Sequence, residues 1–221
     1  TTTGVNDDQA DGHKAYKISL SAPNQGLTDN PVVTTLASGF NKPAGITSDG
    51  TNLYVADTFN NKIRKTVISS GVVTTLAGSG TYTFANGTGT AASFKRPYDI
   101  TTDGTNLYVA DTDNHLIRKI VISSGVVTTL AGSSQGFLDH TTGTSAKFSS
   151  EVKGITTDGT NLYVADRGNN RIRKIVISSG AVTTLAGSGS ATFADGTGTA
   201  ASFKKSNGIT SDGTNLYVAD T

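Results

Sequence analysis

Short runs of alternating apolar and polar residues, separated by turn residues, recur along the chain. From Ile63 to Ser69, for example, successive side chains alternate between two faces, which predicts a β-strand. Comparable short runs at 45–48, 53–56 and 72–77 are separated from it by turn signals such as Asp-Gly and Ser-Gly. No window repeats apolar residues at helical spacing. One such unit is therefore predicted to be an antiparallel meander of four strands.

The pattern is periodic along the whole chain. The segment Asp-Gly-Thr-Asn-Leu-Tyr-Val-Ala-Asp begins at Asp49, Asp103, Asp158 and Asp212, with spacings of 54, 55 and 54 residues. A period of this size, made of four short strands, is typical of a β-propeller blade. The fold class predicted is all-β, a β-propeller of four-stranded antiparallel blades.

The blade boundaries follow from the repeat. Three complete blades are predicted at 43–96, 97–151 and 152–206. The fourth is split, because 207–221 supplies its first two strands and 1–42 supplies the other two. We predict four blades, with this composite blade closing the ring within one molecule. Two alternatives stay open: the ends of two molecules complete one blade in a head-to-tail assembly, or the chain is part of a longer propeller.

The turn and third strand of the second unit carry a recognisable motif, Asn114-His115-Leu116. This segment resembles the NHL repeat, and 60–64 and 169–173 are variants of the same pattern. The resemblance covers nearly the whole chain and is weakest over 1–31. It implies a propeller, although members of the family usually have six blades. It also implies two functional alternatives, since some NHL-like propellers are metal-dependent lyases and others bind RNA on a basic face.

An Asp ends the second strand of every unit, and in three units an Arg follows it seven residues later. We expect the Asp to accept backbone N–H groups from the following turn and the hairpin to bring the two charges together as structural ion pairs. The alternative is a ring of ligand-binding Arg side chains. The pairs are Asp57 with Arg64, Asp111 with Arg118, and Asp166 with Arg173.

Recurring aromatic residues are expected to pack between blades; they are Tyr54, Tyr108, Tyr163, Tyr217, Phe40, Phe94, Phe148 and Phe203. Residues that break the repeat are better candidates for partner binding. Asp99 stands where the other units have Gly, at the start of an inner strand. The candidates are Tyr98, Asp99, Arg167, Lys95 and Arg96. The long loops at 78–93, 132–147 and 187–202 either form a binding surface or only cover the blades.

Composition excludes several classes of function. Only 16% of the 221 residues are charged and the net charge is +1, so nucleic acid is not expected as a partner. The chain has no Cys and only three His, in unrelated repeat positions, so no metal site, cofactor or catalytic residue is predicted. The segment 7–12 resembles a calcium loop only faintly. No apolar run is long enough to span a bilayer.

These observations favour a non-enzymatic binding or structural module of an exported protein, located outside the cell or at its surface. Low charge, many Thr and Ser residues, and the absence of Cys and of an initial Met support that localisation. The expected partner is another protein or a second copy of the chain, and a glycan is an alternative. The runner-up functions are a subunit of an extracellular filament, assembled through terminal strand complementation, and a metal-dependent lyase.

Overall fold

A computed structural model describes residues 13–19 and 32–221, so the segment 7–12 lies outside the described residues. Three sheets carry four consecutive antiparallel strands each, as the repeat predicts. The first contains β3 (Ile46–Ser48), β4 (Asn52–Asp57), β5 (Lys62–Val67) and β6 (Val73–Ala77). The second contains β8 (Pro97–Thr102), β9 (Asn106–Asp111), β10 (Leu116–Val121) and β11 (Val126–Ala131). The third contains β12 (Val152–Thr157), β13 (Asn161–Asp166), β14 (Arg171–Val176) and β15 (Val182–Ala186).

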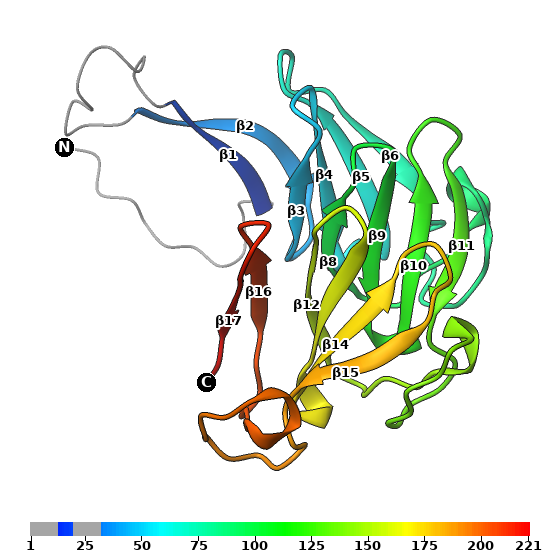
Figure 1. The fold of residues 1–221 in the computed structure, drawn as a ribbon. Helices are drawn as coiled ribbons and strands as arrows, with labels where there is room; N and C mark the ends of the chain where they lie inside the picture. Colours follow the sequence, from blue (N-terminus) through cyan, green and yellow to red (C-terminus); the bar gives the residue numbers. More distant parts are fainter. Residues whose placement is uncertain (1–12, 20–31) are drawn as a thin grey trace.

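These blades stand side by side in an arc (Figure 1), with β3, β8 and β12 as neighbouring inner strands. The cores lie between blades rather than within them. Tyr54 and Ala56 of the first blade pack with Ile100, Leu107 and Val109 of the second. Because each sheet buries one face against the next sheet, the architecture is that of a β-propeller.

The two ends of the chain form separate two-stranded sheets. β1 (His13–Ser19) pairs with β2 (Val32–Phe40), and β16 (Gly208–Ser211) pairs with β17 (Leu216–Ala219). Within the described residues, no pairing joins β17 to β1. Each half is held by its neighbouring full blade instead, through Phe40 in one case and Ile209 in the other. The closure of both halves into one composite blade therefore stays a prediction.

The burial of the recurring tyrosines shows whether a neighbouring sheet covers the face of the blade that carries them. All four donate their hydroxyl to the Asp that opens the same repeated segment, at 2.7–2.9 Å. Tyr54 and Tyr108 are fully buried, whereas Tyr217 is 55% exposed. Burial and the hydrogen bond to Asp49 raise the pKa of Tyr54 to about 12. The face of β17 that carries Tyr217 is thus open among the described residues.

The turns after the second strands are single 3₁₀ turns: η1 (Thr58–Asn60), η3 (Thr112–Asn114) and η5 (Arg167–Asn169). Each ends at a residue in the left-handed region, namely Asn61, His115 or Asn170. Asn is among the non-Gly residues that tolerate this conformation best. His115 is thereby a turn residue, as its position predicts.

Each of the first two long loops crosses to the next blade. In the first loop, β7 (Gly87–Thr88) pairs with β11 and adds a fifth strand to the second blade. In the second loop, His140 and Val182 exchange backbone hydrogen bonds of 3.1 and 2.9 Å. The loops contain the 3₁₀ turns η2 (Gly89–Ala91), η4 (Gly143–Ser145) and, in the third loop, η6 (Gly198–Ala200). They tie blades together as well as covering them.

Candidate binding surface

The seven-residue spacing does bring each Asp to its Arg. The Arg Nη1 to Asp Oδ2 distances are 3.1 Å for Arg64 and Asp57, 2.8 Å for Arg118 and Asp111, and 2.9 Å for Arg173 and Asp166. The expected source of backbone N–H groups was wrong. Each Asp accepts a bond from a backbone N–H in the segment that leads into the inner strand, namely that of Asn41, Lys95 or Ser149 at 2.7–2.9 Å, and does not cap the turn. The reason is register, since Asp111 lies opposite Pro97 in the β8–β9 pair.

Arg118 and Arg173 also hold the long loops. Besides Asp111, Arg118 donates to the carbonyls of Ser93 and Ala85 and to Asn86 Oδ1, at 2.8–3.1 Å. Arg173 makes the corresponding contacts to Lys147, Leu138 and Asp139. Both side chains are fully buried. A buried guanidinium whose two Nη groups already donate to fixed acceptors is not free to contact a ligand, which favours the structural interpretation of these residues.

Asp99 connects two inner strands. Its Oδ1 accepts a hydrogen bond from its neighbour Ile100 and its Oδ2 accepts one from Ile155 in β12, both at 2.9 Å. Burial raises the pKa of this carboxyl, while the two N–H groups act in the opposite direction. Gly45 leaves no room for a side chain beside Asp99. Asp99 Oδ2 therefore joins β8 to β12, while Oδ1 is occupied by the neighbouring amide within β8.

The other four candidates gather at one end of the blades, where the inner strands begin. Arg96 lies over the rings of Phe59 and Tyr82, with its guanidinium carbon 5.1 and 5.8 Å from the ring centroids. Lys95 is 5.6 Å from the Tyr82 ring. Asp113 accepts a 2.9 Å hydrogen bond from the Tyr82 hydroxyl, and this bond raises the pKa of Tyr82. Phe59 and Tyr82 are 44% and 56% exposed.

A second group continues the same surface. The Lys153 ammonium lies 3.7 Å from the centroid of the Tyr98 ring, and Arg167 pairs with Glu151 at 2.6 Å. Burial lowers the pKa of Lys153, on which the charges of Glu151, Arg167, Asp113 and Arg96 also act. The two groups are thus electrostatically continuous. We call the whole set the corner surface: Lys42, Phe59, Tyr82, Lys95, Arg96, Tyr98, Asp113, Glu151, Lys153 and Arg167.

The backbone beneath this surface is strained at basic residues. Lys42 and Arg96 of the corner surface have φ angles of 47° and 48°, and Lys205, at the equivalent repeat position outside this surface, has a φ of 60°. A long side chain in the left-handed region costs about 1–3 kcal/mol, and such strain concentrates at functional sites. The amide of Arg96 is held there by Asn61 Oδ1 at 3.0 Å. The corner thus projects a cation from a fixed backbone.

Six of the ten residues of the corner surface were not among the candidates predicted from the sequence. Tyr82 breaks the repeat, because the equivalent position in the third long loop is Ala191, and the same criterion that selected Tyr98 could have found it. Nothing in the repeat pattern singles out Phe59 and Lys42. Only their contact in the structure, with Lys42 Nζ 4.8 Å from the centroid of the Phe59 ring, places them in the surface. Among residues 13–19 and 32–221, no three His, Asp or Glu side chains are grouped as metal ligands, and no helix has the length and apolarity to span a membrane.

The sequence has relatives among known proteins. No model of a known protein family matches it. NHL repeat-containing protein 2 of Gallus gallus is 28% identical over 151 residues, which are 62% of this chain and 20% of the relative. The human protein of the same name is 30% identical over 167 residues, 67% of this chain and 22% of the relative. The chain therefore spans about a fifth of the length of these relatives.

Solved structures share the fold. A Bacteroides thetaiotaomicron protein of unknown function superposes with a TM-score of 0.69 at 24% identity, covering 86% of this chain and 48% of that one. An auxiliary nutrient binding protein from the same organism gives 0.66 at 20%, covering 86% and 47%. A streptogramin B lyase gives 0.53 at 16%, covering 86% and 52%. Together with the sequence relatives, these structures support an NHL-type β-propeller.

Proposed function

We propose that this chain is a non-enzymatic binding module of an exported protein, and that the corner surface holds an acidic segment of a protein partner. The observation that carries the proposal is the composition of this surface, where Lys42, Lys95, Arg96, Lys153 and Arg167 outnumber two acidic residues. The chain as a whole has a net charge of only +1. Complementary charge of this kind steers a partner and sets its register.

The aromatic residues of the corner surface supply the other half of an interface. Tyr and Arg are enriched among residues that dominate binding energy, and here Arg96 already lies against Tyr82. The scaffold is preorganised, because its turns and strand ends are held by buried ion pairs. A nutrient binding protein of the same fold supports a binding role. The lyase of the same fold makes an enzyme the alternative.

Binding to an acidic chain is the test of this proposal, with fluorescein-labelled poly-L-glutamate as the probe and fluorescence anisotropy as the readout. We expect affinity that falls as salt rises, because screening weakens exposed charge pairs. Arg96→Glu should weaken binding about tenfold, equivalent to about 1.4 kcal/mol. The control Lys119→Glu makes the same charge change in the middle of β10. Equal losses for the two variants, or binding insensitive to salt, would contradict the proposal.

A second candidate function is self-assembly into an extracellular filament. Two observations favour it: the end sheets β1–β2 and β16–β17 are separate, and Tyr217 is exposed on a face that the other blades bury. One molecule's β1–β2 sheet could then complete the β16–β17 sheet of the next, as a heterologous contact.

Light scattering tests this assembly. We expect the mass to rise with concentration and Tyr217→Lys to abolish the rise, because a charge would have to be buried between sheets. Tyr82→Lys is the matched control, since Tyr82 is 56% exposed and Tyr217 is 55% exposed. A single monomeric mass at all micromolar concentrations would argue against assembly.

A further inference from the structure

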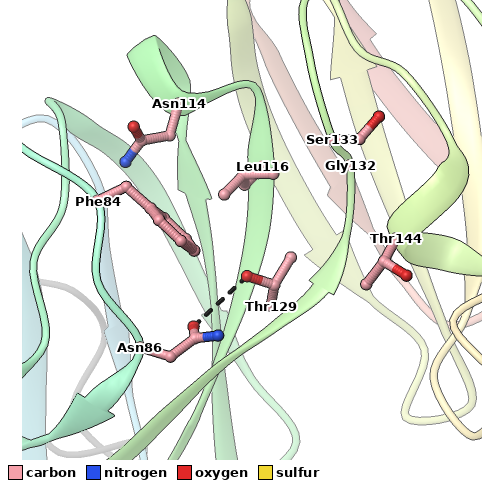
Figure 2. Close-up of a pocket in the computed structure, with 8 residues that line it drawn as sticks. All are labelled: Phe84, Asn86, Asn114, Leu116, Thr129, Gly132, Ser133 and Thr144. Carbon is pink, nitrogen blue, oxygen red and sulfur yellow. Dashed lines mark hydrogen bonds between the residues drawn. The ribbon is translucent and has the colours of Figure 1, made fainter.

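A pocket of about 510 Å³ lies on the side of the second blade. Figure 2 shows Phe84 and Asn86 on one side of it, Ser133 and Thr144 on the other, and Leu116 and Thr129 between them. It is lined by the two long loops at 78–93 and 132–147 and by strands β10 and β11. Its volume falls within the range of small-molecule sites. It shares no residue with the corner surface.

The third blade shows why this pocket exists. Leu116, Lys62 and Arg171 are equivalent, because each pairs with the Asp that ends the second strand. Arg171 lies 3.9 Å from the Phe137 ring centroid and donates to the carbonyls of Asn169 and Ser188, at 3.1 and 2.7 Å.

Phe137 corresponds to Phe84, because Arg173 lies 4.9 Å from the first ring and Arg118 lies 4.8 Å from the second. The space that Arg171 fills in the third blade is left open by the shorter Leu116 in the second.

The polar groups of the pocket are uncharged and oriented. Asn86 Oδ1 accepts a 2.8 Å hydrogen bond from Arg118, which leaves its Nδ2 as a donor. Asn114 donates its Nδ2 to Asp111 at 2.8 Å, which leaves its Oδ1 as an acceptor. In the third blade the residue equivalent to Asn86 is Asp139, a carboxylate bound by Arg173. At this place the third blade has a cation, Arg171, and an anion, Asp139. The second blade has the uncharged Leu116 and Asn86 instead.

We propose that this pocket binds a neutral sugar ring, with the C–H face of the sugar on Phe84 and its hydroxyls on Asn86 and Asn114. Phe84 is 47% exposed, and an exposed aromatic ring offers apolar area without mobility. Sugar hydroxyls both donate and accept, which matches one fixed donor and one fixed acceptor. A peptide side chain of apolar type would find only Phe84 and Leu116 as large apolar partners, and an ionic ligand would find no opposite charge.

Amide NMR of the isotope-labelled protein tests the site, with the methyl α-glycosides of glucose, mannose and galactose as probes. At least one probe should shift the side-chain amide signals of Asn86 and Asn114 with a millimolar dissociation constant. Leu116→Arg should abolish these shifts, because the new side chain would occupy the space that Arg171 fills in the third blade. No shift of these amides with any of the three probes would overturn the proposal, as would shifts that persist in Leu116→Arg.

A second variant covers the case in which Leu116→Arg does not fold. Asn86→Asp installs the residue of the third blade, keeps the acceptor for Arg118 and removes the donor. It should lower the affinity of the best probe about tenfold or more, because a hydroxyl of the bound sugar would be left without its donor. An unchanged affinity in Asn86→Asp would overturn the assignment. The reciprocal variant Arg171→Leu should create no sugar binding in the third blade, because Asp139 lacks the donor.

Discussion

Replacing Arg118 by Met is expected to lower the free energy of unfolding by about 3–5 kcal/mol, because removing one partner leaves a buried charge without compensation. The Asp111 carboxylate is fully buried and would keep only Lys95 N–H and Asn114 as donors. The carbonyls of Ser93 and Ala85 would lose the Arg118 donor at the same time, and each would keep only the backbone N–H of the other residue. Urea unfolding monitored by circular dichroism measures the loss.

Arg64→Met is the matched control for this prediction. Arg64 makes the same ion pair with Asp57, but its side chain is 19% exposed. Among the described residues no long loop docks on it, because β2 continues to Phe40 and leads directly into the first blade. We expect a smaller loss of about 1.5–3 kcal/mol, the worth of a charged hydrogen bond. Hydrogen exchange should accelerate in loop 78–93 for Arg118→Met alone. Equal losses without loop release would show that the loop contacts contribute little.

The second large effect is expected for Gly143→Ala. A Cβ at this position would meet the backbone carbonyl oxygens of Leu130 and Gly180, which belong to two different blades. Backbone atoms cannot rotate away, so loop 132–147 must shift. Overpacking of this kind costs about 1–3 kcal/mol. The thermal midpoint of Gly143→Ala should fall, together with protection of the His140 and Val182 amides that join the loop to β15.

Gly159→Ala separates crowding from backbone strain. Gly159 has a φ of 87° and nothing lies within 4 Å of an added Cβ. Its replacement should cost only the conformational penalty of a Cβ at positive φ, about 1–2 kcal/mol. In Gly159→Ala the amides of His140 and Val182 should keep their protection. If Gly143→Ala were as stable as the parent, the close approach of loop and blade would be absent in solution.

The blades were readable from the sequence because they depend on short-range signals. Alternation and Asp-Gly turns place β4 and β5 within one or two residues of their observed ends. The Asp and Arg of each pair lie in one hairpin, so their seven-residue spacing is enough to bring them together. Burial of Tyr54 and Tyr108 follows from the repeat in the same way.

The docking of the loops and the corner surface could not be read from the sequence in this way. Arg118 contacts backbone carbonyls 25 and 33 residues away, and a carbonyl carries no mark in the sequence. Asp99 was predicted as a partner-binding residue at the start of an inner strand, yet it accepts a hydrogen bond from the N–H of Ile155, 56 residues away. Arg96 and Tyr82 meet only because the first long loop folds back beside the turn that precedes β10. The side pocket depends on Leu116, which is ordinary within its own motif and unusual only beside Arg171 of the third blade.

The loop contacts all run in the same direction along the chain. Arg118 and Arg173 always grip the loop that comes from the preceding blade. A blade can therefore remain folded and still lose the docking of its outer loop when the following blade unfolds. Unfolding of the third blade would release loop 132–147, which belongs to the preceding blade. Unfolding of the first blade would leave the hydrogen bonds between Arg173 and loop 132–147 in place.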